Sequence, residues 1–405
     1  MQTQVRLFSF FILFFAAVQL PAQIILRPKQ NVEKTDADIR TGAERTEVWI
    51  PMLQGKSVAI VANHTSMIGK THLLDTMLRS GIRVKKIFAP EHGFRGMAAN
   101  GEKVASAKDA KTGLPIISLY GEHKKPTVKD FKGIDIVVFD IQDVGVRFYT
   151  YISTLTYVME ACAEQKKKLL VLDRPNPNGY YVDGPVLQPE YKSFVGLHPV
   201  PVVHGMTVAE YARMVNDEGW LTGGIKCDLS WVSCEGYTHS DWYQLPVAPS
   251  PNLPNMTAVY LYPSLCFFEG TVISVGRGTD FPFQVIGHPD LKQAPFKFTP
   301  SPRTGSTNPP YNGQLCYGHD FRDFAMMYVR DYRKLYLFWM MGAYKDMTDK
   351  ANFFNPFFEK LAGTAEFRKQ IIAGTSEDEI RKIWEPGLVK YKQIRKKYLL
   401  YSDFE

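Results

Sequence analysis

Short apolar runs alternate with segments of helical periodicity in the first half of the chain. Helical periodicity is found at about 71–80 and from 150 to about 167. The apolar runs lie at 57–62, 84–89, 114–119, 134–139 and 169–172. Strands that are apolar on both faces are typical of a parallel sheet covered by helices on both sides. The pattern therefore predicts an α/β fold with an open, doubly wound, Rossmann-like parallel sheet.

The pattern changes after a Gly- and Pro-rich bridge at 179–215, which includes a predicted helix at 208–216 with Thr207 as its N-cap. We expect residues 24–216 to form a Rossmann-like domain and residues 217–405 to form a smaller C-terminal α/β (α+β) domain. The second domain is expected to open with a strand at 226–232. Further strands are expected at about 259–268 and 271–275, and helices at 320–344, 352–361 and 376–398.

Residues 1–23 have the pattern of a signal peptide. Arg6 is their only charged residue, 7–18 is an apolar run interrupted only by Ser9, and 20–23 offers a cleavage site with a small residue. The apolar run is shorter than the ~20 residues that span a bilayer. We therefore expect cleavage near residues 22–23, a periplasmic or secreted protein, and no stable insertion into the membrane.

Charge and cysteine content change this picture little. The 48 Lys and Arg residues exceed the 41 Asp and Glu residues by 7, and much of the basic excess follows residue 365. Because export argues against a nucleic-acid partner, we interpret these residues as a solvated face of terminal helices. Of five cysteines, Cys162 is expected to be a buried thiol, and Cys227 and Cys234 could pair across a short turn.

Motifs for common cofactors are not found. The turn after the first strand reads Asn63-His-Thr-Ser66, without the glycines of a dinucleotide-binding loop, and the chain contains no P-loop. NAD, FAD and ATP are therefore not expected. Because the chain has no C-x-x-C and no H-E-x-x-H motif, we also expect no metal site.

Polar residues follow the predicted strands, where open α/β sheets bind their ligands. Because these strand ends converge, we expect a polar active site there. The candidates after the first, second, fourth and fifth strands, with one from the bridge, are Asn63, His64, Glu91, His92, Arg95, Asp140, Gln142, Asp143, Arg147, Tyr149, Asp173, Arg174, Asn176 and His204.

Glu91 is the first choice for a catalytic residue. It follows an apolar strand and Pro90, and Gly93 and Gly96 would let the backbone approach a ligand closely. A carboxyl group shielded by Phe94 would hold its proton at neutral pH, as a general acid requires. The alternative is a loop carboxylate paired with Arg95.

Asp143 is the second candidate, as a group that orients a water molecule or stabilises a cationic transition state. The alternative is an internal pair with Arg147 that braces the loop. His64 and His92 are candidates for proton carriers, and polar histidines with satisfied hydrogen bonds are the alternative.

Loops of the second half add further candidates. Glu269 is a candidate partner carboxylate, Arg277 stands between two glycines as a candidate anion clamp, and Asn252 and Asp280 lie in loops suited to a ligand. Aromatic residues could form a sugar-stacking wall or belong to the core, namely Tyr260, Tyr262, Phe267 and Phe281.

Six stretches carry a resemblance to a known family. They are Glu91-His-Gly-Phe-Arg-Gly96, Thr112–Pro115 with Ser118–Gly121, Phe139–Tyr149, Asp173–Pro177, Pro249–Pro254, and Phe268–Thr271 with Gly276–Thr279. Together they resemble the exo-β-N-acetylmuramidases of glycoside hydrolase family 171, formerly a bacterial domain of unknown function. The resemblance extends from about Val48 to the C-terminus.

The resemblance implies a site in a cleft between two domains and release of terminal N-acetylmuramic acid (MurNAc) from peptidoglycan fragments such as MurNAc-β-1,4-GlcNAc, for cell-wall turnover. It implies a catalytic role for Glu91, and the lactyl ether of the substrate gives Arg95, Arg147 or Arg277 an anion to bind. Retention, inversion and substrate assistance all stay open, as does the oligomeric state. Two other functions remain as alternatives: a metal-dependent hydrolase using His64, His92, Asp143 and His204, and a peptidoglycan-binding protein without activity.

Overall fold

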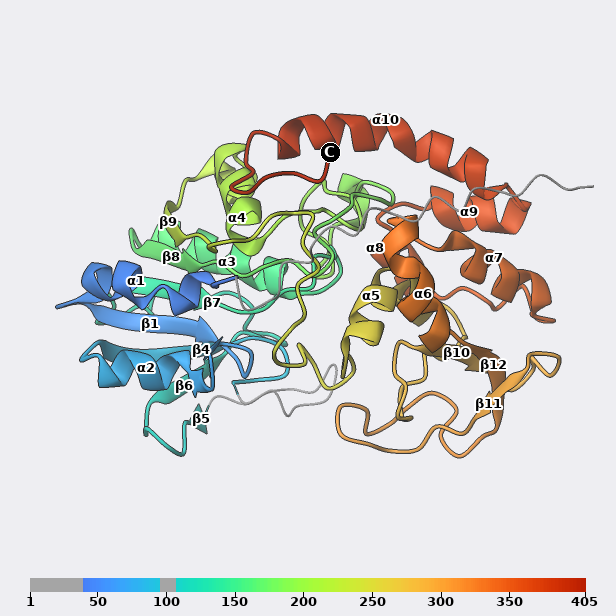
Figure 1. Ribbon diagram of the computed structural model, residues 1–405, viewed down its shortest axis with the longest axis horizontal. Helices are drawn as coiled ribbons and strands as arrows, with labels where there is room; N and C mark the ends of the chain where they lie inside the picture. The colour runs from blue at the N-terminus through green and yellow to red at the C-terminus, as the bar shows by residue number, and fades with distance from the viewer. Residues whose placement is uncertain (1–38, 95–106) are drawn as a thin grey trace, which may run out of the picture. The chain divides into compact units, whose positions relative to one another are not determined.

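The computed structural model describes residues 39–94 and 107–405, apart from the Arg330 side chain. In this part of the chain, seven strands form one sheet in the order β5-β6-β4-β1-β7-β8-β9 (Figure 1). All neighbouring strands are parallel except β5 and β6, which are antiparallel. The strands are β1 (Ser57–Ala62), β4 (Arg83–Ala89), β5 (Ala107–Lys108), β6 (Pro115–Ser118), β7 (Ile136–Asp140), β8 (Lys168–Leu172) and β9 (Asp228–Val232).

Alternate residues of each central strand enter two different cores. In β1, Val58, Ile60 and Ala62 pack with α1 (Thr46–Leu53) and α2 (Leu73–Arg79). Ala59 and Val61 belong to the core that contains α3 (Tyr151–Glu164) and α4 (Val208–Asp217). Both faces of the sheet are therefore covered, which explains the unbroken apolar runs. The predicted doubly wound α/β fold is confirmed.

The order of the strands reverses between β1 and β7. From β1 the sheet grows through β4 to β6 on one side, and through β7 to β8 and β9 on the other. Ligands of such sheets bind outside the carboxyl ends of the strands at this reversal. The loops after β1, β4 and β7 thus share one edge of the sheet.

In the second half, the strand predicted at 226–232 is confirmed, whereas the strand predicted at 259–268 is wrong. The strand expected to open the second domain is β9, which pairs with β8 in the large sheet, so the boundary placed after residue 216 would divide that sheet. The segment 259–268 is helical, in α5 (Met256–Leu265) and the 3-10 helix η5 (Cys266–Gly270). The Asn255 side chain caps α5 by accepting the Ala258 N–H at 2.9 Å. Because α5 is buried on most sides, its apolar run lacked the periodicity that separates a helix from a strand.

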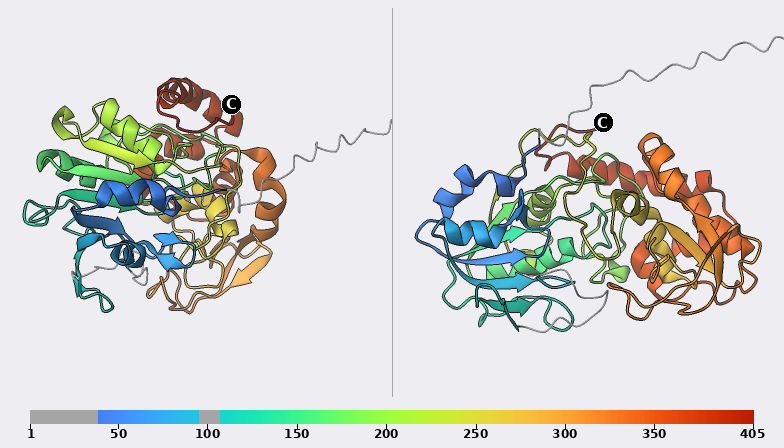
Figure 2. Two further views of the ribbon diagram at one scale, coloured as in Figure 1. Left: turned by 60° about the vertical axis from the view of Figure 1, so that its left-hand side comes forward. Right: turned by 60° about the horizontal axis from the view of Figure 1, so that its bottom comes forward.

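The expected strand at 271–275 makes only isolated bridges, at Thr271 and Ser274. A small antiparallel sheet has the order β10-β12-β11 (Figure 2). It comprises β10 (Val285–His288), β11 (Phe296–Phe298) and β12 (Cys316–Asp320). The remaining elements are η2 (Gly42–Glu44), β2 (Met67–Ile68), β3 (Thr71–His72), η3 (Pro189–Tyr191), η4 (Thr222–Gly224), α6 (Arg322–Tyr332), α7 (Leu337–Asp346), α8 (Phe357–Ala362), α9 (Glu366–Ala373) and α10 (Glu377–Arg395).

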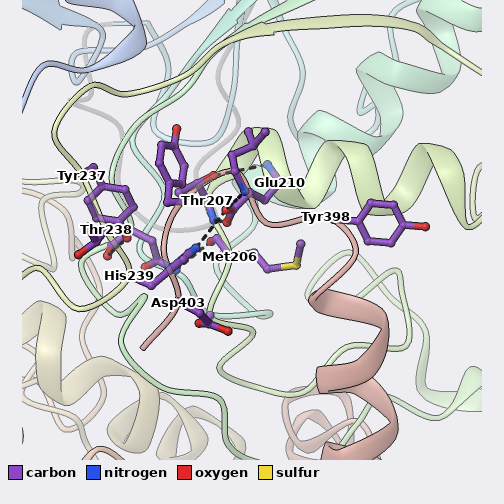
Figure 3. A network of polar contacts seen from close by, with 12 residues as sticks. Met206, Thr207, Glu210, Tyr237, Thr238, His239, Tyr398 and Asp403 are labelled. Atoms are coloured by element: carbon purple, nitrogen blue, oxygen red, sulfur yellow. Dashed lines mark hydrogen bonds and ion pairs between the residues drawn. The ribbon is translucent and has the colours of Figure 1, made fainter. Parts of the chain in front are cut away.

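The segment after α10 returns to the large sheet and to α4 (Figures 1 and 3). Glu210 of α4 lies at the centre of this contact: its Oε1 atom accepts the Leu400 N–H at 2.7 Å and lies 3.0 Å from His239 Nε2. The main chain of His239 donates to the Ser402 carbonyl, and the Tyr401 hydroxyl donates to Asp173 at 2.6 Å. Residues near 400 therefore complete the polar core beside β8 and β9.

All five cysteines are buried free thiols, as predicted for Cys162, and Cys227 and Cys234 form no disulfide. Among the described residues, no helix has the length and apolar character needed to cross a bilayer.

Candidate active site

A cavity of about 570 Å³ opens at the carboxyl edge of the large sheet. Its wall includes the ends of β4, β6 and β7, together with loops and helices of the second half. Of the predicted site residues, six line it: Glu91, His92, Tyr149, Asn252, Glu269 and Arg277. The cavity thus brings together candidates from both halves of the chain.

Glu91 occupies the position predicted for it. The chain turns sharply after it, because Gly93 donates to the Pro90 carbonyl and both His92 and Gly93 have positive φ, 67° and 73°. A non-glycine residue in this region stores strain, which is common at functional sites. The Glu91 side chain is only slightly exposed, and Thr150 Oγ1 donates to its Oε2 atom at 2.7 Å. Phe94 is buried and its ring packs edge-on against His72.

Three tyrosines surround the Glu91 carboxyl group. Burial, followed by the charge of Glu91 and a hydrogen bond to it, raises the pKa of Tyr120. Burial also raises the pKa of Tyr149 and Tyr151, and the charge of Glu91 contributes to both increases. These phenols are therefore hydrogen-bond donors at neutral pH. Asn63 does not line the cavity, but its Nδ2 atom donates to the Tyr151 hydroxyl at 3.0 Å and holds that residue in place.

Glu269 and Arg277 form an ion pair in the cavity wall. Both the Nε and Nη2 atoms of Arg277 lie 2.7 Å from Glu269 Oε1, and the guanidinium group lies over the Phe283 ring. The Nη1 atom of Arg277 is buried and has no hydrogen-bond partner among the described residues. Because this donor is desolvated and unpaired, an anionic ligand would satisfy it.

Polar contacts position two other predicted residues of the wall. Asn252 donates through Nδ2 to the Gly305 carbonyl at 2.8 Å, and the Tyr149 hydroxyl donates to the Pro249 carbonyl at 3.0 Å. His64 does not line the cavity, and its Nε2 atom lies 2.8 Å from the Ala248 carbonyl. Burial lowers the pKa of His64, so this ring is neutral at neutral pH.

Residues that sequence reasoning did not single out also line the cavity: Tyr120, Lys124, Thr150, Tyr151, Phe194 and Ser250. Tyr120 follows the end of β6, and Thr150 directly follows the motif after β7. Their positions in the sequence could therefore have identified them as candidates. Phe194 comes from the bridge after β8, and no local pattern places it beside β6. Of the four aromatic candidates, only Tyr262 lines the cavity.

Asp143 is buried behind the wall and is not among the cavity-lining residues. Gly145 N–H donates to its Oδ1 atom at 2.7 Å, whereas Oδ2 has no partner among the described residues. Burial raises the pKa of Asp143 to about 7, although the N–H groups of Gly145 and Val144 lower it. The expected alternative, a pair with Arg147, is not formed.

This raised pKa predicts that the stability of Asp143→Asn depends on pH less than that of the wild type. The unfolded carboxyl group is largely ionised above its ordinary pKa of ~3.9, whereas the folded one keeps its proton until the pH approaches 7, so the wild type loses stability as pH rises from 4.5 toward 7.5. Relative to wild type, the free energy of unfolding of the variant should rise by about 3 kcal/mol over this range. Urea unfolding at both pH values measures this difference. A constant difference between the two proteins would contradict it.

Arg147 braces the loop after β7 and is not a substrate clamp. Its guanidinium group donates to four main-chain carbonyls, those of Pro185, Val200, Leu361 and Ala362, at 2.8–2.9 Å. Burial lowers the pKa of Arg147 to about 9. These contacts tie α8 to the bridge beside the cavity.

Four more predicted site residues stabilise buried loops. Asp140 and Arg174 form a buried bidentate ion pair at 2.5 and 3.0 Å. Gln142 donates to the carbonyls of Asp143 and Pro175, and Asn176 donates to that of Met206. A buried loop needs such partners for its main chain.

The remaining candidates within the described residues do not line the cavity. Asp173 accepts hydrogen bonds from Thr207, Ala209 and Tyr401, and burial raises its pKa to about 6. Burial lowers the pKa of His204 to about 3. Asp280 is exposed and paired with Arg303, and Arg95 lies outside the described residues.

His64, His92, Asp143 and His204 do not form a metal-binding cluster. Within 39–94 and 107–405, no three His, Cys, Asp or Glu side chains are close enough together to hold a metal ion.

Comparisons with known proteins match nearly the whole described chain. The model for the N-terminal part of the exo-beta-N-acetylmuramidase NamZ matches residues 58–257, and the model for its C-terminal part matches residues 260–401. The peptidoglycan beta-N-acetylmuramidase NamZ of Bacillus subtilis is 39% identical over 375 residues, which are 86% of this chain and 88% of the relative.

Two crystal structures of DUF1343 family proteins from Bacteroides fragilis have the same fold. One is 48% identical with a TM-score of 0.84, and the other is 28% identical with a TM-score of 0.77. Each match covers 90% of this chain and 99% of the other. The sequence motifs, the two-part cavity and these matches agree: the chain belongs to the exo-β-N-acetylmuramidase NamZ family of glycoside hydrolases.

Proposed function

We propose that this protein hydrolyses the β-glycosidic bond that joins a terminal MurNAc residue to a peptidoglycan fragment. The observation that carries the proposal is the position of Glu91, at the end of β4 in the wall of a polar cavity. The activity named for the Bacillus subtilis relative supports the choice of substrate.

Glu91 is the proton donor to the leaving oxygen. The Thr150 hydroxyl, bonded to Oε2 at 2.7 Å, fixes the orientation of the carboxyl group. Tyr120 and Tyr151 place hydroxyl groups and rings around it, which limits the access of water. Proton donation from Glu91 to the leaving group avoids formation of an alkoxide.

Arg277 binds the lactyl carboxylate of the MurNAc residue. Arg147, the alternative cation, does not line the cavity, and four of its five N–H donors are directed at main-chain carbonyls. In contrast, Arg277 retains the buried Nη1 donor in the wall of the cavity, with Glu269 holding the guanidinium group in place. Glu269 is thus both the second carboxylate of the wall and the support of the clamp.

The protein acts outside the cytoplasm, on fragments released during cell-wall turnover. The signal-peptide pattern of residues 1–23 supports this location. The substrate is itself a component of the cell wall, which agrees with export.

Digestion of long, unmodified glycan strands should release monosaccharide first, while the strands shorten slowly. The reason is that the cavity wall combines loops from both halves, including Ser250–Leu253 between Pro249 and Pro254, and so encloses one terminal sugar. Sizing the products over time measures this, with a muramidase that cuts inside chains as the control. Mid-length oligosaccharides in the first samples would show an open groove and contradict exo action.

A further inference from the structure

The contacts between neighbouring side chains give the cavity wall an order. Arg277 lies over Phe283, whose ring centroid is 4.9 Å from that of Tyr262. Tyr262 is 5.8 Å from Tyr149, and Tyr149 is 4.8 Å from Tyr151, both measured between ring centroids. The tyrosines at 149 and 151 then face the charge of Glu91. Glu91 thus lies at the end of an aromatic path that begins at Arg277.

The same path continues beyond the catalytic acid. Tyr120 lies in the same wall near Glu91, whose charge contributes to the raised pKa of Tyr120, and the Tyr120 ring lies 6.2 Å from that of Phe194. Lys124 Nζ lies over the Phe194 ring at 4.9 Å from its centroid. All these residues line the one cavity. Two cations therefore stand in its wall, with Glu91 between them along this path.

The two ends of the path differ in exposure. At one end, Phe283 and Tyr262 are buried and the Arg277 side chain is 12% exposed. At the other end, Tyr120, Lys124 and Phe194 are all partly exposed. Because an exo-acting enzyme encloses the terminal sugar, that sugar lies toward Arg277. The leaving part of the substrate then lies toward Lys124.

Lys124 differs from its neighbours in having no carboxylate partner. Lys125 forms ion pairs with Glu160 and Glu164, and His123 lies 3.2 Å from Asp130. In contrast, no carboxylate in the described ranges pairs with Lys124, whose ammonium group is held by the face of an aromatic ring. Such an ammonium group is positioned but not neutralised.

We propose that Lys124, positioned by Phe194, binds a carboxylate carried by the leaving part of the substrate. This inference rests on the proposed function and deepens it. In a MurNAc–GlcNAc–MurNAc strand the group that it would recognise is the lactyl carboxylate beyond the leaving GlcNAc. The site therefore favours fragments of three or more sugars over the disaccharide.

The test compares kcat/KM for the trisaccharide MurNAc–GlcNAc–MurNAc and for the disaccharide MurNAc–GlcNAc. In Lys124→Met the trisaccharide-to-disaccharide ratio should fall about tenfold, the size of a charge-assisted contact. Phe194→Leu should lower the ratio partially, and Lys124→Arg should retain most of it. Higher ionic strength should reduce the preference of the wild type but not that of Lys124→Met.

Lys129→Met is the matched control, since Lys129 is exposed and is not among the cavity-lining residues. It should keep the wild-type ratio. An unchanged ratio in Lys124→Met, or an equal fall for both substrates, would overturn the inference. If the wild type releases MurNAc from neither substrate, the proposed function itself fails, which is a different result.

Discussion

Glu91→Gln should reduce kcat/KM for the disaccharide MurNAc–GlcNAc, whose leaving group is a sugar hydroxyl, at least ~100-fold, the low end of the range for loss of a general acid. Glutamine is nearly isosteric and can still accept the hydrogen bond that Thr150 donates to Oε2. It cannot donate a proton to the leaving oxygen. The variant should therefore fold normally and fail in the chemical step.

Steady-state kinetics and thermal unfolding together measure this effect. Glu122→Gln is the matched control. Glu122 follows β6 at the same edge of the sheet, is exposed, and is not among the cavity-lining residues. A good leaving group needs less protonation, so the loss in Glu91→Gln should shrink as the leaving group becomes more acidic. Near-normal turnover by this variant would falsify the assignment of Glu91.

The second large effect concerns the choice of sugar. If Arg277 binds the lactyl carboxylate, the wild type should prefer a β-muramide over the matched β-N-acetylglucosaminide by roughly tenfold to more than a hundredfold. The glucosaminide lacks this carboxylate and leaves the buried Nη1 donor of Arg277 unsatisfied. The preference should be lost when the arginine is replaced.

A single replacement of Arg277 would leave Glu269 without its partner. The sharper test is the double variant Glu269→Gln/Arg277→Met, in which both charges are removed together. Its ratio of kcat/KM values for the two substrates should approach one. The ratio is informative even if both rates fall. A double variant that keeps the wild-type preference would rule out the clamp.

The sequence was sufficient to predict five strands of the large sheet, β1, β4, β6, β7 and β8, because the signal there was local. Buried parallel strands such as β1 and β7 are apolar on both faces, and helices between them have a different period. The smaller half lacked such a signal. Segment 256–265 is buried on most sides, so its apolar run is compatible with either a strand or a helix.

For the site, the sequence identified the correct edge of the sheet but not which polar residues face the cavity. Asp140, Gln142 and Arg147 follow the same strand as the cavity residue Tyr149. Gln142 and Arg147 provide partners for buried main chain and Asp140 pairs with Arg174, whereas Tyr149 lines the cavity. Both uses select the same residue types, so composition cannot separate them. Whether such a residue faces the cavity depends on its contacts with distant parts of the chain, such as the hydrogen bond from Arg147 to the Leu361 carbonyl.

Residues near 400 also limit how the chain can be divided. The two family models meet between residues 257 and 260, yet Leu400, Tyr401 and Ser402 bond to groups near β8 and β9. A fragment that stops at residue 257 would keep the whole parallel sheet but leave Glu210 and Asp173 without these donors. We therefore expect the N-terminal half to reach its native structure only after residues 400–402 have packed against it. The two halves should then fold as one coupled unit, so that halves exchanged between family members would lack matching contacts at this place.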